Sequence, residues 1–175
     1  LSWLMEGFAS HWHPATETCL THSTDAGRHW TDPTTFLAGH QCPNLRRLSS
    51  GVWLHHTHRF ELVTDAIEKQ IVDRTGGSLS KGWWPGIQRG TSVHLSKDQG
   101  AHWSEPVYLD HVPGIPARHA LLHAPVAVRG NVLQLADGRI LLSAYGGGET
   151  NTSFLFSSDD EGQSFGFSGI IAEDH

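Results

Sequence analysis

The sequence has few charged residues and no long apolar run, and each scarcity excludes a class of protein. Charged residues make up 17% of the 175 residues, the formal net charge is −6, and the longest basic run is Arg46-Arg47. This balance argues against nonspecific nucleic-acid binding. No apolar stretch approaches the roughly 20 residues of a membrane-spanning helix, so we expect no membrane span. An initiator Met and a signal peptide are both missing, and the sequence leaves the compartment open.

Cysteine is also scarce, with only Cys19 and Cys42 in the chain. Their spacing does not match the CxxC pattern of a metal site, and they fall in different expected elements. A disulfide therefore cannot be assigned from the sequence, and we interpret the two residues as unpaired thiols.

Histidine, in contrast, is abundant, with fourteen residues. In the pairs His11/His13 and His56/His58, a strand conformation places both rings on one face, which is a workable spacing for metal ligands. No third ligand accompanies either pair. We therefore expect half-exposed polar strand positions, and the sequence predicts neither a metal site nor a cofactor.

The composition favours β-structure in a single domain. The 19 glycines and 7 tryptophans are typical of strands joined by tight turns rather than of amphipathic helices. A length of 175 residues is enough for one domain with a substantial core.

An eight-residue pattern, Ser-x-Asp-x-Gly-x-x-aromatic, occurs three times, and we call its copies Asp-box turns 1, 2 and 3. The Asp side chain can accept hydrogen bonds from nearby backbone N–H groups, Gly permits a positive φ, and the Ser hydroxyl adds a local bond. The aromatic residue then begins the next strand. The three copies are Ser23–Trp30, Ser96–Trp103 and Ser158–Phe165.

A second repeat alternates with the first. Asn44–Leu54 aligns without gaps on Asn131–Leu141, and each segment contains an apolar strand, a Ser-Gly or Asp-Gly turn, and another apolar strand. Such turns between apolar runs are strong hairpin signals. With the Asp-box turns, the order becomes a four-stranded antiparallel meander, which is the unit of a β-propeller blade.

The repeats predict an all-β chain of about three propeller blades, near residues 1–40, 43–110 and 125–175 of a single domain, 1–175. The first blade lacks its opening strand in this layout. Long intervals near 61–90 and 110–125 do not fit the minimal unit; we interpret 62–64 and 69–72 as an extra hairpin and the second interval as an ordered loop. Such insertions either form ligand sites or decorate the surface. The expected strands are Trp3–Phe8, Thr18–Ser23, Trp30–Leu37, Asn44–Leu48, Val52–His58, Thr91–Ser96, Trp103–Leu109, Val132–Leu135, Ile140–Tyr145, Ser153–Ser158 and Phe165–Ile171.

Asp-box turns that alternate with Leu-x-Asp-Gly-Arg-x-Leu-Leu strands resemble the sialidase (neuraminidase) superfamily and its wider set of BNR-repeat propellers. The resemblance extends over nearly the whole chain, and its motifs are far more specific for the fold than for a reaction. It implies a six-bladed propeller with a site on the central axis. In that family an arginine triad grips a substrate carboxylate, a Tyr–Glu pair supplies the nucleophile, and an Asp is the acid/base.

The resemblance carries over to only part of such a site. The strand that would hold the first triad arginine precedes Leu1, and the Tyr–Glu pair belongs to blades after His175. The loop before Asp-box turn 1 has no Asp, so His13 or Glu17 would have to replace the acid/base. Tyr145 matches a tyrosine that lines the family's pocket.

Six residues are therefore our candidates for a site. Each also has an ordinary structural interpretation, as a surface arginine, a core-edge tyrosine or a tryptophan that covers a blade. The predicted catalytic residues are Glu149, Tyr145 and His13, and the predicted substrate-binding residues are Arg129, Arg89 and Trp84.

Two functions follow from this pattern. The first is a sialidase-like exo-glycosidase that acts on sialic-acid-type or related anionic glycans, with its site completed outside this chain. The alternative is a non-catalytic propeller that binds glycans or proteins. Three blades leave open sheet faces, so either the chain belongs to a longer protein or a homodimer completes the ring.

Overall fold

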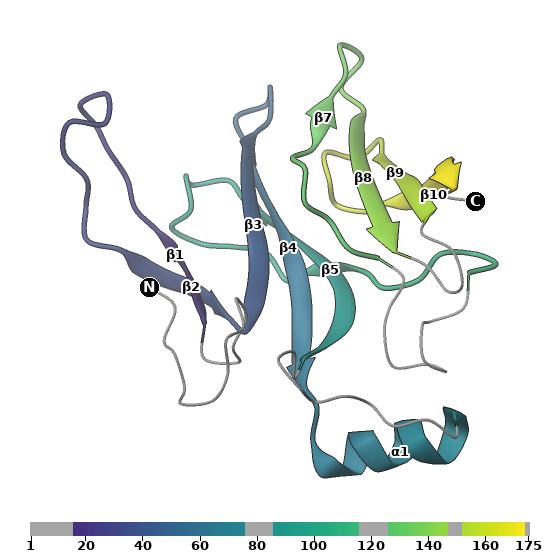
Figure 1. Ribbon diagram of the computed structural model, residues 1–175. Coiled ribbons are helices and arrows are strands. Elements are labelled where there is room, and N and C mark those ends of the chain that lie inside the picture. Colours follow the sequence, from purple (N-terminus) through teal and green to yellow (C-terminus); the bar gives the residue numbers. More distant parts are fainter. Residues whose placement is uncertain (1–15, 76–85, 116–125, 147–151, 174–175) are drawn as a thin grey trace.

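The protein, described here by a computed structural model, is an all-β chain of antiparallel sheets, as the sequence predicts. The structure describes residues 16–75, 86–115, 126–146 and 152–173, which form ten strands and one helix. The strands make a two-stranded sheet and two four-stranded sheets, which lie side by side in chain order (Figure 1). Over the described ranges these sheets do not close into a barrel or a ring.

Each four-stranded sheet is a meander, because its strands pair in chain order. The first sheet contains β1 (Glu17–Leu20) and β2 (Thr34–Ala38). The middle sheet contains β3 (His40–Arg47), β4 (Trp53–Leu62), β5 (Gly86–Ser96) and β6 (Val107–Leu109). The third sheet contains β7 (Leu133–Gln134), β8 (Ile140–Gly146), β9 (Thr152–Ser158) and β10 (Gly166–Glu173). These strands overlap the expected ones; the expected strand Trp3–Phe8 lies outside the described residues.

The three Asp-box turns share one hydrogen-bond pattern, as their sequence predicts. In turn 2 the Ser96 hydroxyl donates to Asp98 Oδ1 at 2.9 Å and accepts the Gly100 N–H at 2.8 Å. Turns 1 and 3 repeat both bonds. The glycine has a positive φ in every copy, and so does the residue before it, for example Gln99 at 61°. Two consecutive left-handed residues explain why glycine recurs in this turn.

The aligned Ser-Gly and Asp-Gly turns are also equivalent in structure. Leu48 N–H donates to the Val52 carbonyl at 2.8 Å, and Gly51 N–H donates to the Leu48 carbonyl at 2.9 Å. Leu135, Gly138 and Arg139 form the same two bonds at 2.8 and 3.0 Å. The predicted hairpins are therefore confirmed at both places.

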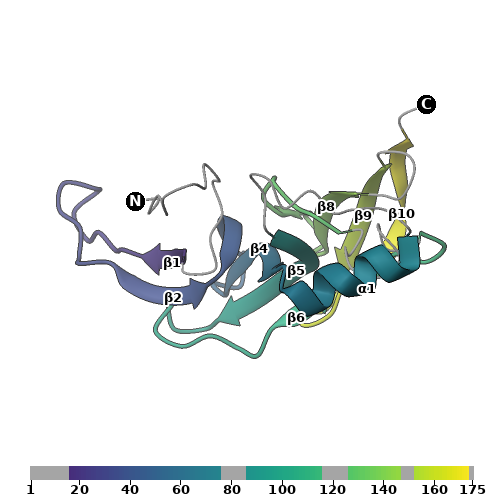
Figure 2. The ribbon, with the colours of Figure 1, turned by 60° about the horizontal axis from the view of Figure 1, so that its bottom comes forward.

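The extra hairpin expected at 62–64 and 69–72 is wrong, because this segment contains the helix α1 (Asp65–Thr75). Thr64 caps the helix: its hydroxyl accepts the Ile67 N–H at 3.3 Å, and its carbonyl accepts the Glu68 N–H at 2.9 Å. Asp65 and Glu68 place negative charge in the first turn, where the helix dipole favours it. The helix projects beyond the sheets at one end of the molecule (Figure 1), the end that comes forward in Figure 2.

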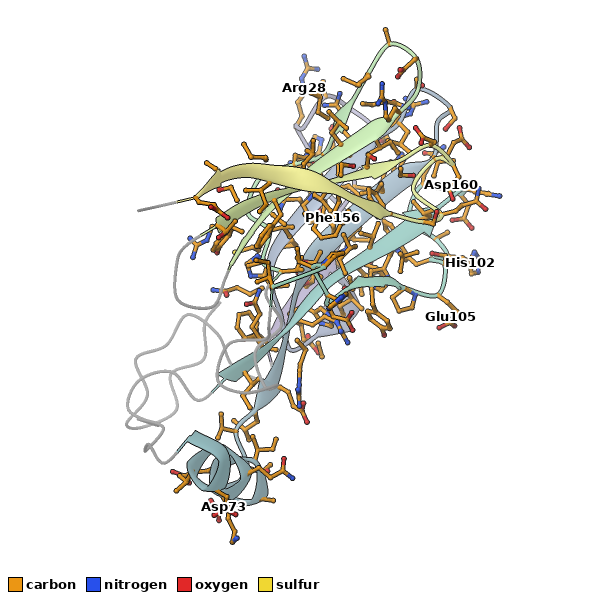
Figure 3. The ribbon with its side chains drawn as sticks, turned by 90° about the vertical axis from the view of Figure 1, so that its right-hand side faces the viewer. Arg28, Asp73, His102, Glu105, Phe156 and Asp160 are labelled. Atoms are coloured by element: carbon orange, nitrogen blue, oxygen red, sulfur yellow. The ribbon has the colours of Figure 1, made fainter. Side chains whose placement is uncertain are left out.

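The core lies between the middle and third sheets. Leu54, Val93, Ile140 and Phe154 are each 0% exposed in it, and Phe156 lies among the side chains of the interior (Figure 3). Asp-box turn 3 takes part in this packing. No helix in the described part of the chain combines the length and apolar content needed to cross a membrane.

Candidate functional site

The histidines of the central strand β4 are buried rather than half-exposed, so our expectation for His56 and His58 is wrong. His55, His56 and His58 are 1%, 0% and 2% exposed. Successive side chains of a strand point to opposite faces of the sheet. Because both faces of β4 are covered, histidines on either face are buried. His55 contacts Phe36 of the first sheet at 4.9 Å between ring centroids. His58 Nε2 faces the other way and accepts the Val128 N–H at 2.7 Å.

Burial holds these imidazoles neutral. Desolvation is the largest of the effects that together lower the pKa of His55 to about 3, and the nearby His94, His56 and His40 contribute the rest. Desolvation likewise lowers the pKa of His56, His58 and His94 to about 4. Neither ring nitrogen of His55 or His56 has a hydrogen-bond partner among the described residues. Within the same ranges no group of three His, Cys, Asp or Glu side chains is arranged to hold a metal ion.

Two of the six candidate residues are in direct contact. The Arg129 Nε–H donates to the Tyr145 hydroxyl at 2.9 Å. Tyr145 is held at the end of β8 by a pair of 2.8 Å backbone hydrogen bonds with Ala127. The ring of Tyr145 also lies 6.4 Å from that of His58, between centroids. We call His58, Arg129 and Tyr145 the rim cluster.

The rim cluster presents a positive charge at the surface. Arg129 is exposed and Tyr145 is 39% exposed. The hydrogen bond that Arg129 donates to the Tyr145 hydroxyl raises the pKa of Arg129, so the guanidinium stays charged. No carboxylate in the described ranges pairs with Arg129, and its two Nη groups form no protein hydrogen bond there. This geometry leaves a planar pair of donors for an anion.

Arg89 has a different role in the structure. Its Nε–H donates to Glu61 Oε2 at 2.6 Å, across the β4–β5 pair. Arg59, which the sequence analysis did not single out, donates to the Arg89 carbonyl and lies 3.9 Å above the Tyr108 ring. The charge of Arg89 is thus already balanced, and substrate binding by Arg89 stays a prediction.

The other three candidates, His13, Trp84 and Glu149, lie outside the described residues. The rim cluster adds His58 to the predicted set. Its sequence signal was the His56/His58 pair, but the hydrogen bond to Val128 joins β4 to the segment before β7, 70 residues away in the chain, and local sequence does not reveal it.

No protein-family model matches the chain, and no curated protein matches it. A solved crystal structure does: an unknown-function protein from Dyadobacter fermentans DSM 18053, with a TM-score of 0.75 and 23% sequence identity. The match covers 95% of this chain and 47% of that one, so the chain spans about half the length of that protein. At this identity the likeness concerns the fold.

Proposed function

We propose that the three sheets are blades of a sialidase-like propeller and that the rim cluster recognises an anionic glycan. The packing between sheets supports blades. In Asp-box turn 3, a Cβ on Gly162 would lie 2.9 Å from Leu54 Cδ1 of the middle sheet. In Asp-box turn 2, a Cβ on Gly100 would lie 3.5 Å from Leu20 Cδ1 of the first sheet. Each turn therefore packs on the preceding sheet, which is a repeating contact.

The first and third sheets, which lie at the two ends of the series of sheets, supply a second argument for blades. Trp103 of turn 2 packs on Phe36 at 4.5 Å between centroids, whereas the equivalent Trp30 of turn 1 is 63% exposed. At the other end, Leu141 and Leu155 of the third sheet are only half-buried. The residues at the equivalent positions of the middle sheet, Leu54 and Val93 respectively, are fully buried. Both faces suit another sheet of the same kind.

Further sheets of a longer chain or a second copy of this chain would cover these faces. In a homodimer, the first sheet of each copy packs on the third sheet of the other. Light scattering on the purified chain should then give twice the 19.2 kDa mass. A stable monomer refutes the homodimer and leaves a longer chain as the source of the cover.

Anion recognition rests on one observation, the guanidinium of Arg129. Tyr145 orients it through Nε, and its Nη groups are not engaged by described residues. A carboxylate accepts two parallel hydrogen bonds from such a group, each worth about 1.5–3 kcal/mol. We therefore expect a carboxylate-bearing sugar, with N-acetylneuraminic acid as the first probe.

The binding test compares this acid with its methyl ester, in which the carboxylate charge is removed. Arg129→Ala should weaken binding of the acid by about tenfold or more. Tyr145→Phe should have a smaller effect, because it frees the arginine without removing it. Arg139→Ala is the matched control, since Arg139 is held by Asp137 at the Asp-Gly turn. Equal binding of acid and ester would refute anion recognition.

Binding alone does not distinguish the hydrolase from the non-catalytic alternative. Hydrolysis also needs a proton donor and a nucleophile or general base, for which the predicted residues are Glu149, Tyr145 and His13. Turnover of a fluorogenic sialoside, abolished in Glu149→Gln with binding retained, supports the hydrolase. Binding without turnover in the unaltered protein supports a glycan-binding propeller.

A further inference from the structure

A groove of about 550 Å³ separates the first sheet from Asp-box turn 2. It lies at the opposite end of the strands from the rim cluster. Strand pairing shows this: Ile140 pairs with Ser158 beside Asp-box turn 3, whereas Tyr145 pairs with Ser153 at the far end of β8. Figure 3 shows His102 of turn 2 and Asp160 of turn 3 on the side away from helix α1 and its Asp73.

The floor of this groove is aromatic. Phe36 and Trp103 line it as a pair, with ring centroids 4.5 Å apart and planes inclined by 31°. His22 lines the same groove and stacks on Trp53 at 5.8 Å. All three lining rings are partly exposed. An accessible aromatic face suits the C–H face of a sugar ring, because the ring quadrupole attracts the polarised hydrogens.

The wall of the groove is polar, and two of its side chains are unengaged. Asp32 and Gln99 are exposed, and neither forms a hydrogen bond or ion pair with another described residue. Thr31 fixes this wall, because its hydroxyl accepts the His22 N–H at 3.0 Å. A carboxylate and an amide are suitable partners for sugar hydroxyls, which both donate and accept.

The charges exclude an anionic ligand. Among the described residues that line the groove there is no Lys or Arg, and Asp32 carries a negative charge. A smaller groove of about 370 Å³ lies between the middle sheet and turn 3, and it differs from the larger groove in its charges and in its aromatic side chains. Its described lining includes the charged side chains of Lys97 and Glu161, and its rings there are those of Trp103 and His102, without a second Phe, Tyr or Trp.

We propose that the larger groove binds a neutral saccharide, with the sugar ring against Phe36 and Trp103 and its hydroxyls bonded to Asp32 and Gln99. A site of this size and composition has the usual form of a small-ligand pocket, an apolar floor with a few polar groups. This site is separate from the rim cluster and does not depend on the function proposed for it.

Three neutral disaccharides serve as probes: lactose, cellobiose and N,N′-diacetylchitobiose. Saturation-transfer NMR and titration of tryptophan fluorescence should detect binding of at least one. Asp32→Ala and Gln99→Ala, both at exposed positions, should each raise the dissociation constant about tenfold. Lys97→Ala in the smaller groove is the matched control and should leave binding unchanged.

Arg129→Ala distinguishes the two sites, because it should weaken binding of N-acetylneuraminic acid by about tenfold or more and leave binding of the neutral disaccharide intact. Failure of all three disaccharides to bind would overturn the saccharide groove without bearing on the rim cluster. Equal weakening by Lys97→Ala and Asp32→Ala would overturn it as well. Circular dichroism of each variant confirms that the fold is retained.

Discussion

The middle and third sheets have the same strand order and equivalent turns, yet their interiors differ in chemistry. In the middle sheet His55 pairs with His94 across β4 and β5, and in the third sheet Leu142 pairs with Phe156 at the equivalent register position. All four side chains are at most 5% exposed. The same backbone position thus accepts an ionisable pair in one sheet and an apolar pair in its neighbour.

The difference shows that the repeat specifies backbone geometry rather than core chemistry. Turn bonds and strand register depend on the Ser, Asp and Gly residues, which both sheets contain. The core positions need only side chains of suitable volume at neutral pH, where a buried imidazole is uncharged. Protonation makes the histidine pair differ from the apolar pair, because a charge in the interior is costly unless it is paired.

The largest expected effect is therefore loss of stability in acid. The pKa of each buried histidine is lower in the folded state than the ordinary 6.5, so the unfolded chain binds more protons below that pH. Stability should fall as the pH decreases from about 6.5 toward about 4. For His56, with a pKa of about 4, the loss between about pH 8 and pH 5 is about 2 kcal/mol. Urea unfolding across this pH range measures the slope.

A double substitution, His55→Leu with His94→Phe, copies the third-sheet pair into the middle sheet. It should reduce the pH dependence by the share of His55 and His94 while the fold remains, and the share of His56 and His58 should persist. Phe156→Leu in the third sheet is the control, and it should lower stability equally at every pH. Hydrogen exchange at about pH 5 should show β4 and β5 opening before β8 and β9. An unchanged slope in the double variant would contradict this account.

A second prediction concerns the contact between the two sheets. Gly162 has a φ of 87°, and an added Cβ would meet Leu54 at 2.9 Å and Leu95 at 3.3 Å. Gly138 has a φ of 92°, but an added Cβ would meet nothing within 4 Å. Both Ala variants carry the strain of a left-handed residue, about 1–2 kcal/mol, and Gly162→Ala adds overpacking of about 1–3 kcal/mol. The midpoint temperature of thermal unfolding should be lower for Gly162→Ala than for Gly138→Ala. Equal midpoints would contradict this prediction and show that Leu54 can move away from the added Cβ.

The smallest effect is expected at the Asp-box turns themselves. The ring of His102 bonds Asp98 Oδ2 at 2.6 Å in turn 2, and the Ser164 hydroxyl bonds Asp160 Oδ2 at 2.6 Å in turn 3. The backbone and ring bonds from His102 lower the pKa of Asp98 to about 2. His102→Ala should raise that pKa, as carboxyl NMR titration can measure, and should shift the urea midpoint less than either glycine variant. The stabilisation from Asp98 is present at neutral pH and is lost as the pH falls from about 3.8 through about 2.

Much of the fold could be predicted because its signals are local. An Asp-box turn is complete within eight residues, so Ser96, Asp98 and Gly100 specify their own bonds. The helix α1 was missed although Thr64 and Asp65 are ordinary helix-start residues, because the apolar residues of 69–72 were interpreted as a strand. Short apolar runs occur in both helices and strands, and in this segment the capping residue Thr64 is the signal that indicates a helix.

The candidate site was less predictable. Arg129 and Tyr145 were selected one by one from a resemblance, and their 2.9 Å contact depends on the loop at Ala127 pairing with the end of β8. The burial of His55 and His56 depends on two neighbouring sheets that cover β4. No feature of a histidine-rich strand indicates that both of its faces are covered.

The sequence by itself determined the elements that close within a few residues: the three Asp-box turns, the two glycine turns and the antiparallel order of the strands between them. Their hydrogen bonds join near neighbours, and glycine or aspartate is required at particular positions. Only the tertiary structure decided which faces are buried, which histidines are held neutral and which arginine keeps its donors unpaired. Those properties depend on desolvation and contact between sheets, to which residues far apart in the chain contribute.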